Sequence, residues 1–185
     1  MKSKYTLKLI TIGIISLIFF LVGATSCNQC HNKNMGEENT DVSSDSVFLA
    51  ETAASNLIEI KITQLAQEKT SNDSIKDFAK MLERDHTNLY NDLQTLAKVK
   101  SIIIPTSVIS ENMKMYDEMK EKDEPEFDEG FCEMMVNKHK KSIAKFEKTA
   151  KESNDLDIRN FAISALPTLR NHLAMALRYQ ERYRN

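Results

Sequence analysis

Apolar residues recur at helical spacing in four long runs, which begin near residue 47 and continue almost to the end of the chain. The inward stripe of the first run, 47–69, contains Phe48, Thr52, Ser55, Glu59, Ile62 and Ala66. Asp45 or Ser46 is the expected N-cap of this helix. The second run starts after 71–73, and its apolar residues at heptad spacing are Ile75, Phe78, Leu82, Leu89, Leu93 and Leu96. These patterns predict two amphipathic helices joined by a short turn.

The second half of the chain repeats this organisation. Segment 153–162 resembles 71–79, because each joins a Ser-Asn-Asp turn to the apolar start of a helix. The third helix is predicted to begin at Pro125, and its seam contains Phe127, Phe131, Met135, His139, Ile143, Phe146 and Ala150. The fourth carries Ile158, Phe161, Ala165, Leu169, His172 and Ala176, with a kink expected at Pro167. The pattern therefore predicts two helical hairpins.

The connection between the hairpins, 98–124, is too long for a tight turn. It contains a short extended stretch, 101–105, and then a helix of about sixteen residues that starts at Thr106 or Ser107. Such a helix spans about 24 Å and can return the chain along the other helices. The predicted fold is all-α: a ferritin-like four-helix bundle with a long helical crossover.

Each predicted long helix carries one polar residue on its apolar seam: Glu59, His86, His139 and His172. Counted from the first turn, Glu59 and His86 lie at one level, about 20 Å along the hairpin. His139 and His172 are expected to lie about one helical turn out of step, a difference that the kink can absorb. Three imidazoles and a carboxylate suit a zinc or iron ion, with Asp85 as an extra ligand or as support for one.

Two features of these positions bear on the type of site. Glu83 and His86 form the Glu-x-x-His pair of ferritin-like di-iron proteins, but Val136 and Leu169 stand at the equivalent places before His139 and His172. The chain therefore offers too few acids for a full di-iron set. The alternative interpretation is a hydrogen-bonded polar network that fixes helix register without metal.

The N-terminal end has a different character. Lysines precede the apolar run 9–22, and 24–27 reads Ala-Thr-Ser-Cys, which resembles a bacterial lipobox. We expect residues 1–26 to be a signal peptide, Cys27 to carry lipid, 27–45 to form a flexible tether, and 46–182 to form the helical domain. The alternative is an uncleaved membrane anchor. The expected location is the cell envelope, on the outer membrane facing the periplasm.

The net charge of the chain limits the classes of partner that we expect. The chain has 25 Lys and Arg against 27 Asp and Glu, and loss of the signal peptide removes three lysines and no acids. The resulting net charge of −5 argues against nucleic acid as a partner. The expected partner is the membrane, through the lipid anchor; under the alternative interpretation without metal, another envelope protein is a partner as well.

The tether contains a second motif. Cys27, Cys30 and His31 have the spacing of a c-type haem attachment site. One sulfur cannot carry both lipid and haem, and the polar residues that follow offer no apolar crevice. A haem carrier is therefore a minor alternative. Cys30 and Cys132 are not expected to form a structural disulfide.

The chain resembles a bacterial family called domain of unknown function 4142 over about 48–177. The matching positions are Phe48-Leu49, Ala53-Ala54, Glu59, Leu65-Ala66, Phe78-Ala79, Met81, Asp85-His86, Pro105, Phe127-Asp128, Met135, His139, Phe161-Ala162 and 166–172. The resemblance implies a ferritin-like bundle exported to the envelope, and it supplies no established reaction. We therefore expect a role in metal handling or stress defence; the alternative is a helical interaction module without metal.

Overall fold

The computed structural model describes residues 43–184, which form an all-α structure. Its five helices are α1 (Ser44–Lys69), α2 (Asp73–Val99), α3 (Ser110–Lys120), α4 (Glu126–Glu152) and α5 (Leu156–Arg184). No strand occurs within 43–184. None of the helices in this range combines the length and apolar content needed to cross a bilayer.

Side-chain caps explain where the long helices begin. Oδ1 of Asn72 accepts hydrogen bonds from the backbone N–H of Ser74 and Ile75, and Oδ1 of Asp155 accepts from Asp157 and Ile158 in the same way. The repeated turn motif thus has the same function in both hairpins. The predicted caps of the first helix, Asp45 and Ser46, were wrong. The hydroxyl of Ser43 accepts from the N–H of Ser46 at 3.2 Å, so α1 begins earlier, at Ser44.

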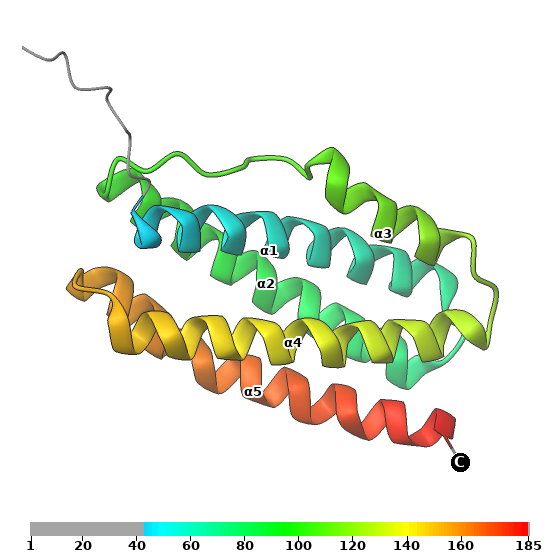
Figure 1. Ribbon diagram of the computed structural model, residues 1–185. Coiled ribbons are helices and arrows are strands. Elements are labelled where there is room, and N and C mark those ends of the chain that lie inside the picture. The colour runs from blue at the N-terminus through cyan, green and yellow to red at the C-terminus, as the bar shows by residue number, and fades with distance from the viewer. Residues whose placement is uncertain (1–42, 185) are drawn as a thin grey trace, which may run out of the picture. The chain divides into compact units, whose positions relative to one another are not determined.

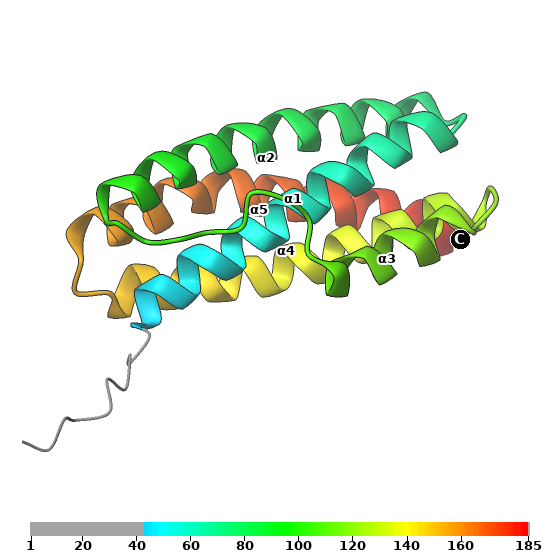
Figure 2. The same cartoon turned by 90° about the horizontal axis from the view of Figure 1, so that it is seen from above.

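The four long helices lie side by side in two antiparallel hairpins (Figures 1 and 2). Helix α1 packs extensively on α2, and α4 packs extensively on α5. The hairpins meet along two less extensive seams, α1 against α4 and α2 against α5. Helix α3 lies beside α1 and α4, in the connection that takes the chain from the end of α2 back to the start of α4.

The crossover helix is shorter than predicted. Helix α3 has 11 residues and starts at Ser110 instead of Thr106 or Ser107, so it rises only about 16 Å. The hydroxyl of Tyr90 donates to the carbonyl of Pro105 at 2.9 Å, which ties the preceding segment to α2 and takes that carbonyl out of any helix. The chain therefore covers the remaining distance as a non-helical segment, 101–109.

The buried face of α2 also differs in detail from the heptad prediction. Leu89 and Leu96 are only partly buried, whereas Tyr90 and Ala97 are buried. The buried positions 75, 79, 82, 86, 90, 93 and 97 follow a 3.6-residue period. A straight helix drifts by about 20° per heptad away from a strict seven-residue repeat, so its buried face moves off the heptad positions along its length. The helix thus packs as in a globular protein and not as a coiled coil.

The core consists of two apolar clusters at different heights along the helices. One includes Ile62, Phe78 and Phe131, and the other includes Phe48, Leu93 and Phe146. Buried polar side chains lie at the heights between these clusters: Thr52, Asn56, Glu59, Thr63, His86, His139 and His172. Burial of a polar group without a partner is costly, so these side chains require satisfied hydrogen bonds or a ligand.

Candidate functional site

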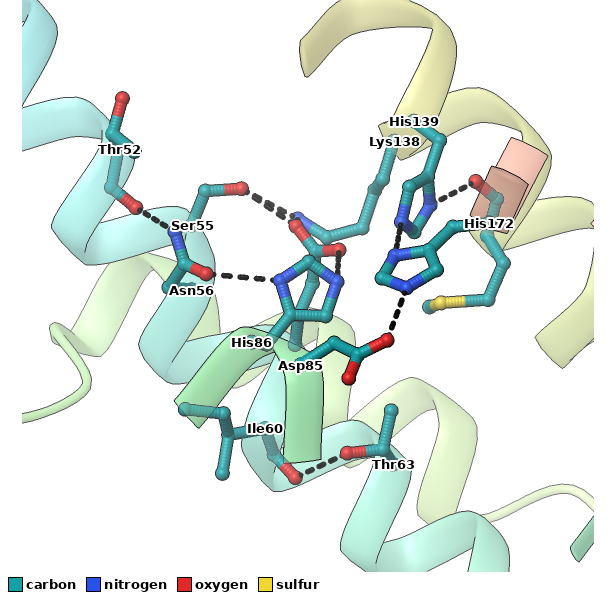
Figure 3. A network of polar contacts seen from close by, with 12 residues as sticks. Thr52, Ser55, Asn56, Ile60, Thr63, Asp85, His86, Lys138, His139 and His172 are labelled. Carbon is teal, nitrogen blue, oxygen red and sulfur yellow. Dashed lines mark hydrogen bonds and ion pairs between the residues drawn. The ribbon is translucent and has the colours of Figure 1, made fainter. Parts of the chain in front are cut away.

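Four predicted site residues meet in this polar layer (Figure 3). Glu59 lies on α1, His86 on α2, His139 on α4 and His172 on α5, with exposed fractions of 2%, 3%, 0% and 1%. The three imidazole rings have centroid separations of 5.1–5.4 Å. The fifth predicted residue, Asp85, contacts His172 from a partly exposed position at the edge. The structure therefore brings the three histidines together, with Glu59 against His86 and Asp85 against the outer nitrogen of His172; among the described residues, the three histidines form the group close enough to share one ion.

His139 and His172 lie at one level, so the predicted offset of one helical turn was wrong. Nε2 of His139 is 3.2 Å from Nδ1 of His172. Side chains on a helix tilt toward its N-terminus. In the antiparallel pair α4–α5, His139 therefore tilts away from the connecting turn and His172 tilts toward it. Because residue counting along the backbone ignores this tilt, it overstates the separation of the rings.

The environment of His86 fixes which of its nitrogens carries hydrogen. The amide nitrogen of Asn56 donates to the carbonyl of Thr52 at 2.8 Å, which leaves Oδ1 of Asn56 facing Nδ1 of His86 at 2.9 Å. An amide oxygen only accepts, so Nδ1 of His86 carries the hydrogen. Nε2 of the neutral ring then holds a lone pair, 3.3 Å from Oε2 of Glu59. Two acceptors cannot form a hydrogen bond, and Nε2 has no hydrogen-bond partner within 43–184.

The other two rings are oriented in the same way. Nδ1 of His139 donates to the carbonyl of Met135 at 2.8 Å. Nε2 of His172 donates to Oδ2 of Asp85 at 3.0 Å. A backbone carbonyl and an ionised carboxylate only accept, so these outer nitrogens carry the hydrogens. A histidine held by a carbonyl or carboxylate on one side is the arrangement in which the other nitrogen binds metal.

The three rings therefore direct their inner nitrogens toward one another. The inward atoms are Nε2 of His86, Nε2 of His139 and Nδ1 of His172; the last two lie at hydrogen-bond distance from each other, whereas Nε2 of His86 has no hydrogen-bond partner within 43–184. One ring nitrogen from each of these histidines lies within 4.8 Å of the others. A tetrahedral ion with bonds of about 2.0–2.1 Å separates its ligands by about 3.3 Å, close to the distance between His139 and His172.

Burial favours the neutral form of His86 and His172. Desolvation lowers the pKa of His86 to about 4, despite the opposing effect of Glu59, and desolvation also lowers the pKa of His172. Desolvation raises the pKa of Glu59, but nearby positive charge, from His86 and Lys138 above all, and the hydrogen bond from Ser55 outweigh it and bring the pKa to about 2. At neutral pH Glu59 is thus a carboxylate beside the uncharged ring of His86, the protonation state in which these two groups bind a metal cation.

Two supporting residues were missed by the sequence analysis, namely Asn56 and Lys138. Lys138, on α4, places Nζ 3.6 Å from Oε1 of Glu59, and Ser55 donates to the same oxygen at 2.9 Å. The signal for Asn56 was its spacing, since positions 52, 56, 59 and 63 form one buried stripe of α1. Lys138 carried no such signal, because a lysine beside a buried histidine is an ordinary surface pattern.

Glu83 takes no part in the site, so the Glu-x-x-His spacing with His86 is coincidental. Its carboxylate accepts hydrogen bonds from the side-chain amides of Gln64 and Gln67, at 2.7 and 2.6 Å. Cys132 is a buried free thiol. The predicted lipid site Cys27 and the haem motif with Cys30 and His31 lie outside the described residues.

A groove between α2 and α5 leads from the surface to the histidines. Its volume is about 220 Å³, and His86 and His172 line its inner end. The charged residues that line it are Asp85 and Asp92, and no lysine or arginine of 43–184 does so. A cation can therefore approach the cluster along an acidic route.

Comparison with known proteins agrees with the resemblance noted from the sequence. The profile of one family, described as Domain of unknown function (DUF4142), matches residues 31–178, which is well over half of the chain. The matched segment contains Glu59 and the three buried histidines. No curated protein and no solved structure matches the chain. The chain therefore belongs to the family described as Domain of unknown function (DUF4142).

Proposed function

We propose that this protein binds one transition-metal ion, zinc or iron, through Glu59, His86, His139 and His172. The observation that carries the proposal is the convergence of the inner histidine nitrogens. Three outer nitrogens face fixed acceptors, one ring nitrogen from each histidine lies within 4.8 Å of the others, and Nε2 of His86 has no hydrogen-bond partner within 43–184. An apo network built only for structure would instead alternate donors and acceptors.

The ligand atoms of the site favour a metal ion of intermediate softness. Imidazole nitrogens with one carboxylate oxygen suit zinc and iron, whereas magnesium and calcium prefer oxygen-only sites. Asp85 has the role of a supporting acceptor that orients His172. Ser55 and Lys138 hold one oxygen of Glu59, and its other oxygen faces the histidines.

We further propose that the fold is a ferritin-like four-helix bundle. Two antiparallel hairpins with a long return connection support this assignment, as does the polar layer built from all four long helices. Ferritin chemistry does not follow from it, since the site has one carboxylate where a di-iron centre needs about four. Metal handling or defence against metal stress is the role that fits a single buried ion.

The proposed location is the cell envelope, with lipid on Cys27 and no nucleic acid as partner. The lipobox-like sequence before Cys27 and the acidic mature chain support this. The mass of the N-terminal peptide from membrane fractions tests it: an acylated Cys27 is expected, and a Soret band with haem on Cys27 and Cys30 would refute it.

Metal content tests the proposed site. Protein purified without chelator, and apo protein titrated with Zn²⁺ or Fe²⁺ in an anaerobic calorimeter, should bind one ion per chain. The variants His86→Gln and His172→Gln should lose it, and Thr87→Gln is the matched control because Thr87 is the adjacent, exposed position of α2. At a free metal concentration of 100 times Kd, stability should rise by about 2.7 kcal/mol. That gain corresponds to roughly 10 °C in Tm for a domain of this size.

Equal metal content in the control and in both site variants would refute the proposal. So would the absence of binding in a wild-type protein whose circular dichroism shows intact helices. The protein would then be a helical interaction module, in which the polar layer sets the register of the helices.

A further inference from the structure

A second groove reaches the same cluster from the opposite pair of helices. It lies between α1 and α4, has a volume of about 160 Å³, and includes Glu59 and His86 in its lining. Unlike the groove between α2 and α5, this one is lined by lysines. The two routes to the site therefore differ in the sign of their charge.

The lysines Lys138, Lys141 and Lys145 occupy one stripe of α4 along this groove. Lys138 pairs with Glu59, and Lys145 pairs with Glu51. Lys141, between them, forms no ion pair or hydrogen bond with any residue in 43–184. The three lysines of the groove contact two carboxylates, so one positive charge in the groove has no ion-pair partner within 43–184.

On the α1 side, the groove is lined by Thr52, whose buried hydroxyl has no hydrogen-bond partner within 43–184 (Thr52 is labelled in Figure 3). Thr52 is only 3% exposed. Ser55 and Ser142 add hydroxyls to the same lining. A buried hydroxyl without a partner is unfavourable, so a ligand that accepts its hydrogen would be stabilised here.

We propose that the groove between α1 and α4 binds a small oxyanion, of the size and charge of phosphate, next to the metal ion. Ammonium groups and hydroxyls are the donors that oxyanions require, and the excess charge of Lys141 supplies the attraction. The volume is below the roughly 300 Å³ of pockets that hold drug-sized ligands, which excludes nucleotides. This inference extends the proposed function and rests on it for the second ligand, the metal.

The groove between α2 and α5 cannot serve the same ligand. Asp85 and Asp92 line it without any lysine or arginine from 43–184; Arg84 pairs with Asp85 at 2.9 Å, and the carboxylate of Asp92 disfavours anions. A cation and an anion would therefore reach the cluster from different sides. Since Glu59 and His86 end the basic groove, the bound oxyanion would lie within reach of the ion's ligands.

Calorimetric titration with inorganic phosphate tests the inference on the full chain, both metal-free and zinc-loaded. Lys141→Ala should weaken phosphate binding about tenfold, as expected when one charged donor is lost. Lys140→Ala is the matched control, because Lys140 is the adjacent exposed lysine of α4 and does not line the groove. Both variants should bind zinc as the wild type does.

Thr52→Val gives a second test that does not depend on charge. It preserves the branched shape and removes the hydroxyl, so it should weaken phosphate binding without loss of thermal stability. A purely structural hydroxyl would instead cost stability when removed. Failure of phosphate to bind, or equal affinity in Lys141→Ala and Lys140→Ala, overturns the inference while zinc binding still supports the metal site. Phosphate binding that depends on Lys141 in a protein without zinc affinity overturns the proposed function and leaves the anion site standing.

Discussion

Acidification should destabilise the metal-free protein through His86. In the unfolded chain this imidazole takes up a proton near pH 6.5, whereas burial in the folded protein delays protonation until about pH 4. Between these values the unfolded state binds more protons, so the free energy of unfolding falls as pH falls. A difference of 2.5 pH units corresponds to about 3 kcal/mol, which is fully present above pH 6.5 and lost at pH 4. The stability that ionised Glu59 contributes is lost at lower pH, between its usual pKa of 4.5 and its pKa of about 2 in the folded protein.

Urea unfolding followed by circular dichroism at pH 7, 6, 5 and 4, in the presence of chelator, measures this loss. His86→Gln removes the titrating ring at similar volume, so its stability should depend less on pH over the same range, by about 3 kcal/mol. Thr87→Gln, at the adjacent exposed position of α2, is the control and should behave as the wild type. Parallel pH profiles for wild type and His86→Gln would show that burial of the neutral ring is not the cause.

Three other measurements bear on the site and the core. Asn56→Leu removes the acceptor for Nδ1 of His86 and should weaken zinc binding by about 10–100-fold; unchanged affinity would contradict the assigned tautomer. Asp92→Asn should slow zinc association roughly twofold to fivefold at low salt, and Asp77→Asn, whose exposed carboxylate lies outside the groove, should not; equal rates would contradict an acidic entry route. Burial raises the pKa of Cys132 to about 12, so with the other two cysteines replaced by serine, a maleimide should label the protein only in urea. Rapid labelling of the native protein would show that the thiol is accessible.

The sequence pattern predicted the four long helices because each carries both an apolar stripe and a start signal. Asn72 and Asp155 cap α2 and α5 in the same way. The crossover was harder to predict, since the segment before its helix makes a tertiary contact. The hydroxyl of Tyr90 holds the carbonyl of Pro105, and no local propensity reveals that bond.

The site residues were predictable as interruptions of apolar seams, but their geometry was not. The offset expected for His139 and His172 came from counting backbone positions, and side-chain tilt removes it. The hydrogen bonds that orient the histidines could not be predicted for a similar reason, because they depend on contacts between helices. Asn56 contacts His86 across two helices, and only the 3.6-residue spacing of α1 marks it as buried.

The cluster draws its members equally from two distant halves of the chain. Glu59 and His86 belong to the hairpin of α1 and α2, whereas His139 and His172 belong to that of α4 and α5. Contacts between neighbours in sequence form earlier in folding than distant ones, so each hairpin should assemble before the two dock. An ion held by residues of both hairpins would then bind only after the hairpins had docked. Metal binding in a cell would therefore mark the last step in the folding of the newly made protein.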